Sequence, residues 1–353
     1  MQTADERVAS AIANWAPRFV ANGVDINDFQ RVTAEIASWS DWCARWSKLG
    51  EEHEGLMRAA LEGGHYRTAA ACGLRAAMAY HFGKFLFVER PDELRRAHEN
   101  NVRVYEEALP HFSVPGERVE IPYEGAVMPG ILRRPWHAAR PPVVILIPGL
   151  DSVKEELHAY ADDLLERGLA TLAIDGPGQG EMEFDYPMRH DYEVAVAAAI
   201  DFLQSRRDVD ARRVGLMGVS LGGYYAPRAA AYEPRVRAAV AVAGAYNFAD
   251  RFDHRPALTQ AAFVARLHAA SREEAIERLR AFSLEGAGAR IRVPLLVIMG
   301  GQDRLVDPAD AERLVRETPG AELWLFPEGN HVVNNLPYRY RPQAADWLLD
   351  RLA

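Results

Sequence analysis

The strongest constraint on the fold is an alternation, from residue 143 to residue 352, of short apolar runs with stretches of helical periodicity. Short aliphatic runs bounded by turn residues are typical of buried strands, and apolar residues at three- and four-residue spacing are typical of helices. The expected strands are Val143–Ile147, Leu169–Ile174, Arg213–Met217, Ala238–Ala243, Pro294–Met299 and Glu322–Phe326, and the expected helices are Glu155–Arg167, Tyr192–Gln204, Leu221–Tyr232, Ala309–Glu317 and Arg341–Leu352. This order predicts an α/β fold with a mostly parallel sheet and helices on both faces.

The flanking segments add three further parts. Residues 1–115 have helical periodicity throughout, which predicts a helical N-terminal domain. Residues 116–245 and 291–353 form the two parts of the α/β core, and a predicted hairpin, Arg118–Tyr123 with Val127–Leu132, opens the first of them. Residues 246–290 interrupt the alternation, and because they are too many for an ordinary loop we expect a helical cap insertion there.

Composition and charge exclude several classes of function. Lys and Arg number 41 against 50 Asp and Glu, a net charge of −9, so a nucleic-acid partner is not expected. The polar N-terminus lacks a signal peptide, and no apolar run reaches the roughly 18 residues of a membrane span, so the prediction is a cytoplasmic protein. Cys43 and Cys72 lack the CxxC spacing of a zinc site and are expected to be buried free thiols; neither metal nor organic cofactor is predicted.

One motif indicates a nucleophile. Gly218-Val219-Ser220-Leu221-Gly222 matches G-x-S-x-G, directly after a predicted strand and before a predicted helix. In such a strand-to-helix turn the glycines permit a tight backbone, and the serine hydroxyl projects at the positive end of the helix. The pattern also arises by chance in turns with a buried serine, but this context predicts that Ser220 is a catalytic nucleophile.

A serine nucleophile needs an imidazole to take its proton and a carboxylate to orient that imidazole. Asp303 and His331 each follow a predicted strand, where a loop at the carboxyl edge of the sheet would place them beside Ser220. Asp307 is a rival for the acid, whereas His254 and His268 fall in the cap segment. The chain order Ser, Asp, His resembles that of the α/β-hydrolases.

Two backbone N–H groups should complete the site as an oxyanion hole. The first is that of Leu221, and the second should come from the loop Pro148–Ser152, with Leu150 preferred over its neighbours. The segment Gly176–Gly180 lacks the full dinucleotide-binding pattern and is interpreted as a turn. The helical spacing of three tryptophans predicts a core or a subunit interface: Trp39, Trp42 and Trp46.

Four stretches together resemble a subgroup of the α/β-hydrolases that includes 2,6-dihydroxypseudooxynicotine hydrolase, fungal polyketide-shortening pigment hydrolases and FrsA-like esterases. They are Gly149–Glu156, Asp175–Met182, Gly218–Gly223 and Gly301–Asp303. The resemblance implies an N-terminal helical domain joined to the cap, a homodimer, and hydrolysis of a carbon–carbon bond in a 1,3-dicarbonyl or acyl-aromatic ketone. In that reaction either Ser220 attacks the ketone or His331 activates water.

Three functions remain open from the sequence. The first is the carbon–carbon bond hydrolase, the second a carboxylesterase or acyl hydrolase with the same catalytic residues, and the third a non-catalytic binding protein of this fold. The expected ligand is a small molecule with an aromatic or ketone group. Near Arg255, where the resemblance to the hydroxylated-pyridine enzyme leads us to expect a cap carboxylate, the segment Ala245–Arg255 departs from that enzyme, which argues against the same substrate. Candidate pocket residues are Tyr246, Phe248, Phe252 and His254.

Overall fold

A computed structural model describes residues 5–353 of the chain, which divides into two compact units between Glu117 and Arg118. The first unit is helical, with α1 (Glu6–Ala21), α2 (Ile26–Ala34), α3 (Trp42–Glu62), α4 (Tyr66–Lys84), α5 (Pro91–Ala108) and short 3₁₀ helices at Trp39–Asp41 and Leu109–His111. Local sequence sets several of these boundaries. Asp5 caps α1 and Asp25 caps α2 through their carboxylates, and Pro91 occupies the first turn of α5.

Aromatic side chains form the core of the helical unit. Trp39, Trp42 and Trp46 are fully buried, and the Phe19 ring stacks on that of Phe82 with centroids 3.8 Å apart. The Trp42 indole N–H donates to the Phe82 carbonyl over 2.8 Å, so its one polar atom is satisfied. Of the two roles that the sequence left open for the three tryptophans, the structure shows core packing.

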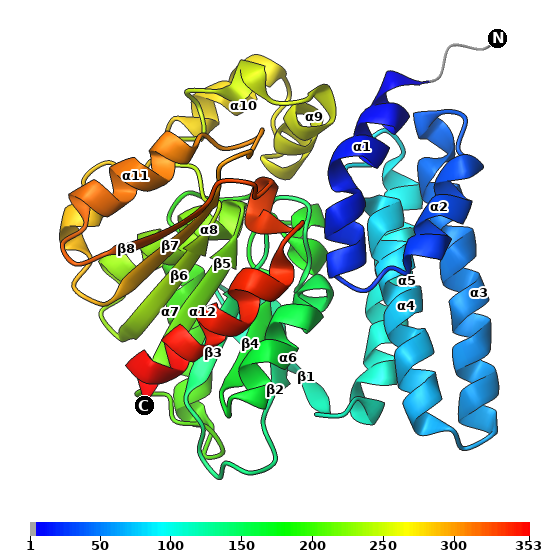
Figure 1. Ribbon diagram of the computed structural model, residues 1–353, viewed down its shortest axis with the longest axis horizontal. Helices are drawn as coiled ribbons and strands as arrows, with labels where there is room; N and C mark the ends of the chain where they lie inside the picture. The colour runs from blue at the N-terminus through cyan, green and yellow to red at the C-terminus, as the bar shows by residue number, and fades with distance from the viewer. Residues whose placement is uncertain (1–4) are drawn as a thin grey trace. The chain divides into compact units, whose positions relative to one another are not determined.

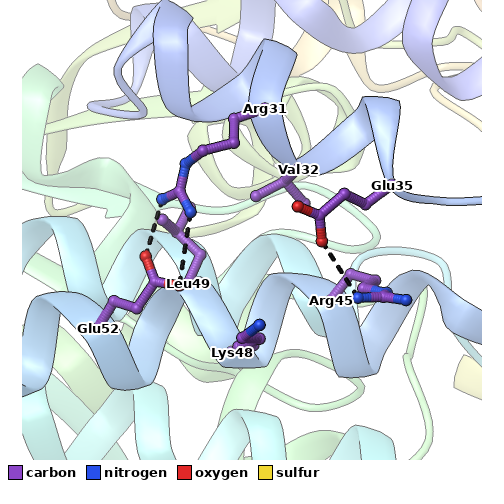
Figure 2. A pocket seen from close by; sticks show the side chains of 7 residues that line it. All are labelled: Arg31, Val32, Glu35, Arg45, Lys48, Leu49 and Glu52. Atoms are coloured by element: carbon purple, nitrogen blue, oxygen red, sulfur yellow. Dashed lines mark hydrogen bonds and ion pairs between the residues drawn. The ribbon is translucent and has the colours of Figure 1, made fainter.

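Charged residues pair on the surface of this unit. Figure 2 shows a small pocket crossed by two ion pairs between α2 and α3, Arg31 with Glu52 at 2.8 Å and Glu35 with Arg45 at 3.1 Å. The pocket is lined by Arg31, Val32, Glu35, Arg45, Lys48, Leu49 and Glu52. Four of its lining side chains are charged groups held in these two ion pairs, so the pocket offers little apolar surface to a ligand of the predicted kind.

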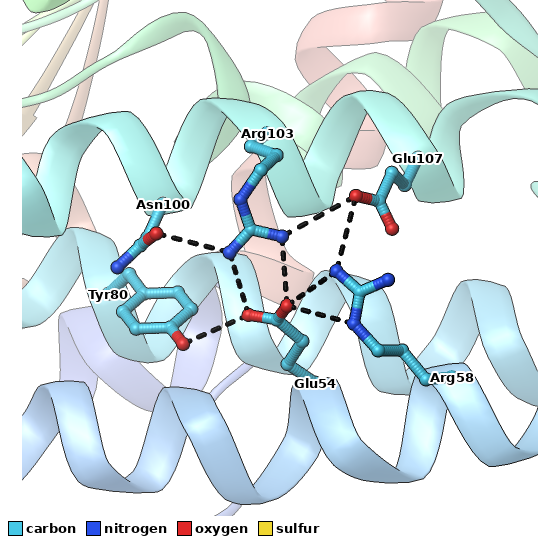
Figure 3. Close-up of polar contacts among 6 residues, drawn as sticks. All are labelled: Glu54, Arg58, Tyr80, Asn100, Arg103 and Glu107. Atoms are coloured by element: carbon cyan, nitrogen blue, oxygen red, sulfur yellow. Dashed lines mark hydrogen bonds and ion pairs between the residues drawn. The ribbon is translucent and has the colours of Figure 1, made fainter.

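A second polar cluster joins α3 to α5, and Figure 3 shows it. The Arg103 guanidinium donates to both carboxylate oxygens of Glu54, at 2.8 and 2.9 Å. Arg58 donates to the same carboxylate over 2.7 Å, and the Tyr80 hydroxyl donates to it over 3.1 Å. The cluster therefore ties three helices together through one acid.

The second unit contains an eight-stranded sheet in the order β1-β2-β4-β3-β5-β6-β7-β8. The strands are β1 (Gly116–Tyr123, which begins before the boundary of the units), β2 (Ala126–Arg133), β3 (Val143–Ile147), β4 (Ala170–Ile174), β5 (Val214–Val219), β6 (Val236–Val242), β7 (Leu295–Gly300) and β8 (Glu322–Phe326). From β4 to β8 neighbouring strands are parallel, whereas β2 runs antiparallel to β4. The predicted mostly parallel sheet is therefore confirmed.

Helices cover both faces of this sheet (Figure 1). They are α6 (His158–Glu166), α7 (Glu193–Ser205), α8 (Leu221–Tyr232), α11 (Pro308–Glu317) and α12 (Pro337–Leu352). On one face α6 packs against α12, where the Tyr160 and Tyr340 hydroxyls lie 2.8 Å apart, and α8 packs behind β5 and β6 on the other. Strands β3, β4, β5 and β7 are buried along their whole length, which puts the hydrophobic core in the middle of the sheet.

The segment of residues 246–290, between β6 and β7, contains the helices α9 (Ala257–Arg266) and α10 (Arg272–Leu279). The buried side chains of Arg266 and Glu183 form an ion pair of 2.9 Å, and the Arg266 carbonyl accepts from the Met188 N–H. Because Glu183 and Met188 follow the carboxyl end of β4, this segment reaches the carboxyl edge of the sheet. Among the described residues, no helix combines the length and apolar character needed to cross a bilayer.

Candidate active site

Ser220 lies in the turn between β5 and α8. Its backbone angles, φ 56° and ψ −112°, fall outside the regions that L residues ordinarily adopt. Such strain persists only where the surroundings hold it, and it occurs most often at functional sites. Here the Ser220 N–H donates to the Val242 carbonyl at the end of β6 over 2.8 Å. The turn is thus fixed to the centre of the sheet's carboxyl edge.

Close backbone contacts explain the glycines around Ser220. A Cβ atom at Gly218 would lie 2.0 Å from the Gly222 carbonyl oxygen, and a Cβ at Gly222 would lie 2.2 Å from the Ile147 carbonyl oxygen. No larger residue fits either position without moving the backbone. The glycines of the motif are therefore needed to form the turn that presents the serine.

The structure brings the three predicted catalytic side chains together. The Ser220 Oγ lies 2.9 Å from Nε2 of His331, and Nδ1 of the same ring lies 2.7 Å from Oδ2 of Asp303. The Asp303 side chain is fully buried, and its Oδ1 accepts from the N–H groups of Leu305 and Val306 at 2.8 and 3.0 Å. An acceptor at Nδ1 favours the tautomer that leaves Nε2 free to accept a proton from Ser220.

The rival acid has another role. Asp307 caps α11 by accepting from the Ala309 N–H and forms an ion pair with Arg251 at the surface. Of the two candidate acids, Asp303 is the one that contacts His331, whereas the Asp307 carboxylate binds Ala309 and Arg251.

The turn after His331 is also strained, because Val332 and Val333 have φ values of 60° and 53°. Left-handed backbone is rare for β-branched residues, whose side chain crowds the carbonyl. The Asn330 N–H, on the other side of the histidine, donates to the Asn335 side chain over 2.9 Å. The surroundings thus hold His331 in one orientation from both sides.

Two N–H groups were predicted to face a developing oxyanion. Leu221 is the first residue of α8, and its N–H is among those that a helix leaves unpaired at its start. The loop that carries Leu150 passes directly beside the serine, because a Cβ on Gly149 would lie 3.2 Å from the Ser220 Cβ. Both predicted donors therefore come from backbone that borders Ser220.

Sequence reasoning missed a buried charged cluster in the loops after β3 and β4. The Lys154 ammonium lies 2.6 Å from Glu155, 3.0 Å from Asp175 and 2.6 Å from Glu181. Burial lowers the pKa of Lys154, but the three carboxylates outweigh it, so its pKa rises above the usual range. Burial raises the pKa of Glu181 and its cationic neighbours, Lys154 first, lower it to about 2 overall.

The predicted pocket residues are placed differently from one another. Phe248 is buried, with its ring edge-on to that of Tyr224 on α8, 5.6 Å between centroids, and Phe252 is buried in the same segment. Tyr246 is bound instead to α11, where its hydroxyl donates to Glu317 over 2.5 Å, and His254 is exposed. The Phe248 ring thereby contacts α8, the helix that follows Ser220.

Arg255, near which the resemblance led us to expect a cap carboxylate, is buried in the 246–290 segment. Its Nη1 donates to the Phe248 carbonyl over 2.8 Å, and burial lowers the pKa of the guanidinium to about 10. The described residues include no group of three or more His, Cys, Asp or Glu side chains arranged to hold a metal ion.

This fold and this site geometry define the α/β-hydrolase class. The chain matches the family described as Esterase FrsA-like over residues 35–353 and belongs to that family. It is accordingly an enzyme, a hydrolase of α/β-hydrolase type, and the suspected subgroup is confirmed.

Two curated relatives illustrate the range of the similarity. 2,6-dihydropseudooxynicotine hydrolase of Paenarthrobacter nicotinovorans is 31% identical over 99% of this chain and 95% of its own length. Hydrolase acrC of Aspergillus aculeatus is 34% identical over 59% of this chain and 54% of its own length. The similarity thus extends over the whole length of the bacterial relative but only about half of the fungal one.

Comparison with solved structures gives the same family relationship. A crystal structure of 2,6-dihydroxy-pseudo-oxynicotine hydrolase superposes with a TM-score of 0.89 at 30% identity, covering 96% of both chains. The structure of AbyA5 superposes with a TM-score of 0.73 at 21% identity, covering 92% of this chain and 94% of its own, a likeness of fold alone.

Proposed function

We propose that this enzyme is a serine hydrolase that cleaves a carbon–carbon bond in a 1,3-dicarbonyl or acyl-aromatic ketone. The observation that carries the proposal is the chain of contacts from Ser220 through His331 to Asp303, at 2.9 and 2.7 Å. Those distances are within the range in which a base can take a proton from a nucleophile and a carboxylate can orient that base.

In the first half of the reaction Ser220 Oγ bonds to the ketone carbon while its proton moves to His331 Nε2. The carbonyl π electrons move to the oxygen, which the N–H groups of Leu221 and Leu150 stabilise. When the carbonyl re-forms, the carbon–carbon bond breaks and its electron pair leaves as a carbanion, delocalised into the second carbonyl or the hydroxylated ring. His331 returns the proton to that carbanion, which leaves an acyl group on Ser220.

In the second half water attacks the acyl carbon while His331 takes one of its protons. The second tetrahedral intermediate expels Ser220 Oγ, which regains a proton from His331, and the products are a carboxylic acid and the shortened ketone or phenol. Asp303 stays ionised throughout and stabilises the imidazolium. Every proton transferred in this scheme moves between the three side chains, the substrate and water, so the reaction needs no further acid or base.

Similarity along the chain supports the proposal that the enzyme hydrolyses a carbon–carbon bond. The relative named as a hydrolase of a pseudooxynicotine matches nearly the whole chain, including the helical unit. The edge-on contact of the Phe248 ring with that of Tyr224, on the helix that follows Ser220, also suits an aromatic substrate. A carboxylesterase is the second candidate, since the family description names an esterase and the same three side chains would cleave an ester.

The test is a substrate screen of the wild-type protein and Ser220→Ala, pairing 1,3-diketones and acylphenols with aryl esters and identifying products by mass spectrometry. Loss of the nucleophile should lower turnover by roughly 10⁴- to 10⁶-fold. Ser205→Ala, the same change at the end of α7, is the matched control and should retain full activity.

The outcomes separate the candidates. Carbon–carbon cleavage that Ser220→Ala abolishes supports the proposal, and Ser220-dependent turnover of esters alone makes the enzyme an esterase. Diketone cleavage that survives in Ser220→Ala would instead assign the chemistry to water activated by His331.

A further inference from the structure

The loop that carries the predicted oxyanion donor is held by one buried amide. The Gln179 Nε2 donates to the Pro148 carbonyl over 2.6 Å and to the Gly149 carbonyl over 3.2 Å. Its Oε1 accepts from the Tyr192 hydroxyl over 2.6 Å, and neither side chain is exposed to solvent. Because two carbonyl oxygens can only accept, the nitrogen of the amide must face them, which fixes its orientation.

Peptide geometry connects this amide to the reacting centre. The Gly149 carbonyl and the Leu150 N–H belong to the same peptide group, and the described residues contain no cis peptide bond. In a trans peptide these two groups point in opposite directions, so a carbonyl held by Gln179 turns the Leu150 N–H to the other side of the loop. Gly149 itself lies against Ser220, because a Cβ added to it would lie 3.2 Å from the Ser220 Cβ.

The amide is itself held from the helix that follows the nucleophile. The Tyr192 ring stacks on that of Tyr225 in α8, with centroids 3.9 Å apart and planes 13° from parallel. Both rings are fully buried. A continuous set of contacts therefore runs from α8 through Tyr192 and Gln179 to the loop beside Ser220.

We propose that Gln179 is a positioning residue that presets the Leu150 N–H for the oxyanion formed during hydrolysis, and that Tyr192 holds Gln179 in the required orientation. The inference rests on the proposed function and deepens it. The side chain of Gln179 binds the carbonyls of Pro148 and Gly149 and the Tyr192 hydroxyl, so it acts through the peptide that it holds. Its effect should appear in the transition state, where the oxyanion exists, and not in the ground-state complex.

The experiment compares wild type with Gln179→Met, which keeps the approximate volume but loses both donors. The substrates are an aryl ester and whichever ketone the screen identifies, and the inhibitor is a trifluoromethyl ketone that forms a tetrahedral adduct with the serine. Loss of one oxyanion donor costs about 10²- to 10³-fold in kcat, so Gln179→Met should lower kcat by up to that factor with KM nearly unchanged. Inhibitor binding should weaken by a similar factor, and the pH profile should not move.

Tyr192→Phe provides a second variant that keeps the stacked ring and removes only the hydroxyl. It should lower kcat in the same direction but less, by roughly 3- to 10-fold, because Gln179 keeps its carbonyl partners. Gln204→Met, an exposed glutamine on α7, is the control for the substitution itself and should match wild type.

The experiment distinguishes failure of the proposed function from failure of the inference about Gln179. If the wild-type serine neither reacts with a fluorophosphonate nor supports turnover, the proposed function falls. If the wild type reacts but Gln179→Met and Tyr192→Phe retain its kcat and inhibitor affinity, only the inference about Gln179 falls. An equal weakening of substrate and inhibitor binding would also overturn it, since that is the mark of general damage to the site.

Discussion

The helical unit and the sheet unit place their charged residues differently. In the helical unit they pair at the surface, as in Arg31 with Glu52, whose side chains are 48% and 45% exposed. The sheet unit has surface pairs as well, such as Arg251 with Asp307, but it also pairs charges in its interior, as in Lys154 with Asp175, 1% and 0% exposed. Surface pairs add little to stability, whereas a buried pair is costly to desolvate and strongly destabilising to break. The loops after β3 and β4 are therefore expected to depend on this buried pairing for their position.

The largest expected effect comes from removing the buried cation. Lys154→Met leaves the carboxylates of Asp175 and Glu155 buried without their partner, so we expect the free energy of unfolding to fall by about 3–5 kcal/mol. The measurement is the rate of methionine oxidation by peroxide as a function of urea, followed by mass spectrometry. Met299 in β7, fully buried, reports the sheet unit, and Met78 in α4, also fully buried, reports the helical unit.

The control for this variant is Lys48→Met, the same change at an exposed position of α3, which should alter stability by no more than about 0.5 kcal/mol. The comparison fails if both variants lose similar stability, or if Lys154→Met shifts Met78 as much as Met299. Either result would mean that the buried cluster does not stabilise the sheet unit in particular.

The stability of the helical unit should instead be sensitive to added side-chain volume where its helices pack together. A Cβ on Gly73 in α4 would lie 2.6 Å from the Ala108 Cβ of α5 and 2.7 Å from the Met57 Sδ of α3. Three helices meet there, so Gly73→Ala should cost about 1–3 kcal/mol by overpacking, seen as earlier oxidation of Met78 in urea.

Gly55→Ala is the matched control, because a Cβ there has no neighbour within 4 Å. It should stabilise α3 by about 0.5–1 kcal/mol, since alanine loses less conformational entropy than glycine in a helix. Stabilisation by both substitutions would show that the three helices have room to separate at Gly73.

Much of the sheet unit was predictable because its strands are short and apolar throughout. The predicted bounds of Val143–Ile147, Leu221–Tyr232 and Glu322–Phe326 coincide with β3, α8 and β8. The helix expected from Glu155 begins at His158 instead, since a 3₁₀ turn, Lys154–Leu157, precedes it. The Lys154 N–H donates to Asp175 over 2.8 Å, a contact between distant residues that helical periodicity cannot reveal.

The helix expected from Arg341 begins earlier, at Pro337, because a proline at 342 masks its first turns in the sequence. Of the two thiols expected to be buried, Cys43 is, but Cys72 is only partly so.

The contacts among Ser220, Asp303 and His331 were predictable for a related reason, as each of the three residues follows a recognisable strand. Gln179 was not, because its segment was interpreted only as a turn. A signal was available: the two stretches Gly149–Glu156 and Asp175–Met182 follow β3 and β4, neighbouring parallel strands whose carboxyl ends meet at one edge. A contact between those stretches could have been inferred from that topology. The homodimer, the cytoplasmic location and the contribution of the helical domain to a cap stay predictions.

The smallest effect should come from the surface cluster of the helical unit. Hydrogen bonds from Arg103, the largest influence, and from Arg58 lower the pKa of Glu54 to about 2. A carboxylate with a depressed pKa adds stability above its unfolded pKa of about 4.3, and that stability is lost as the pH falls from about 5 towards 2.

Glu54→Gln should therefore cost no more than about 1 kcal/mol at pH 7, because its partners are half exposed and screened by solvent. At pH 3 the difference from wild type should shrink, because Glu54 is already protonated in the unfolded wild-type chain, which removes part of the stability that its depressed native pKa supplies. The rate of Met78 oxidation in urea, recorded at both pH values, measures this difference in stability. The control is Glu62→Gln, at an exposed acid at the end of α3, whose stability relative to wild type should not depend on pH. A loss of several kcal/mol at pH 7 would place this cluster with the buried ions of the sheet unit and remove the contrast between the two units.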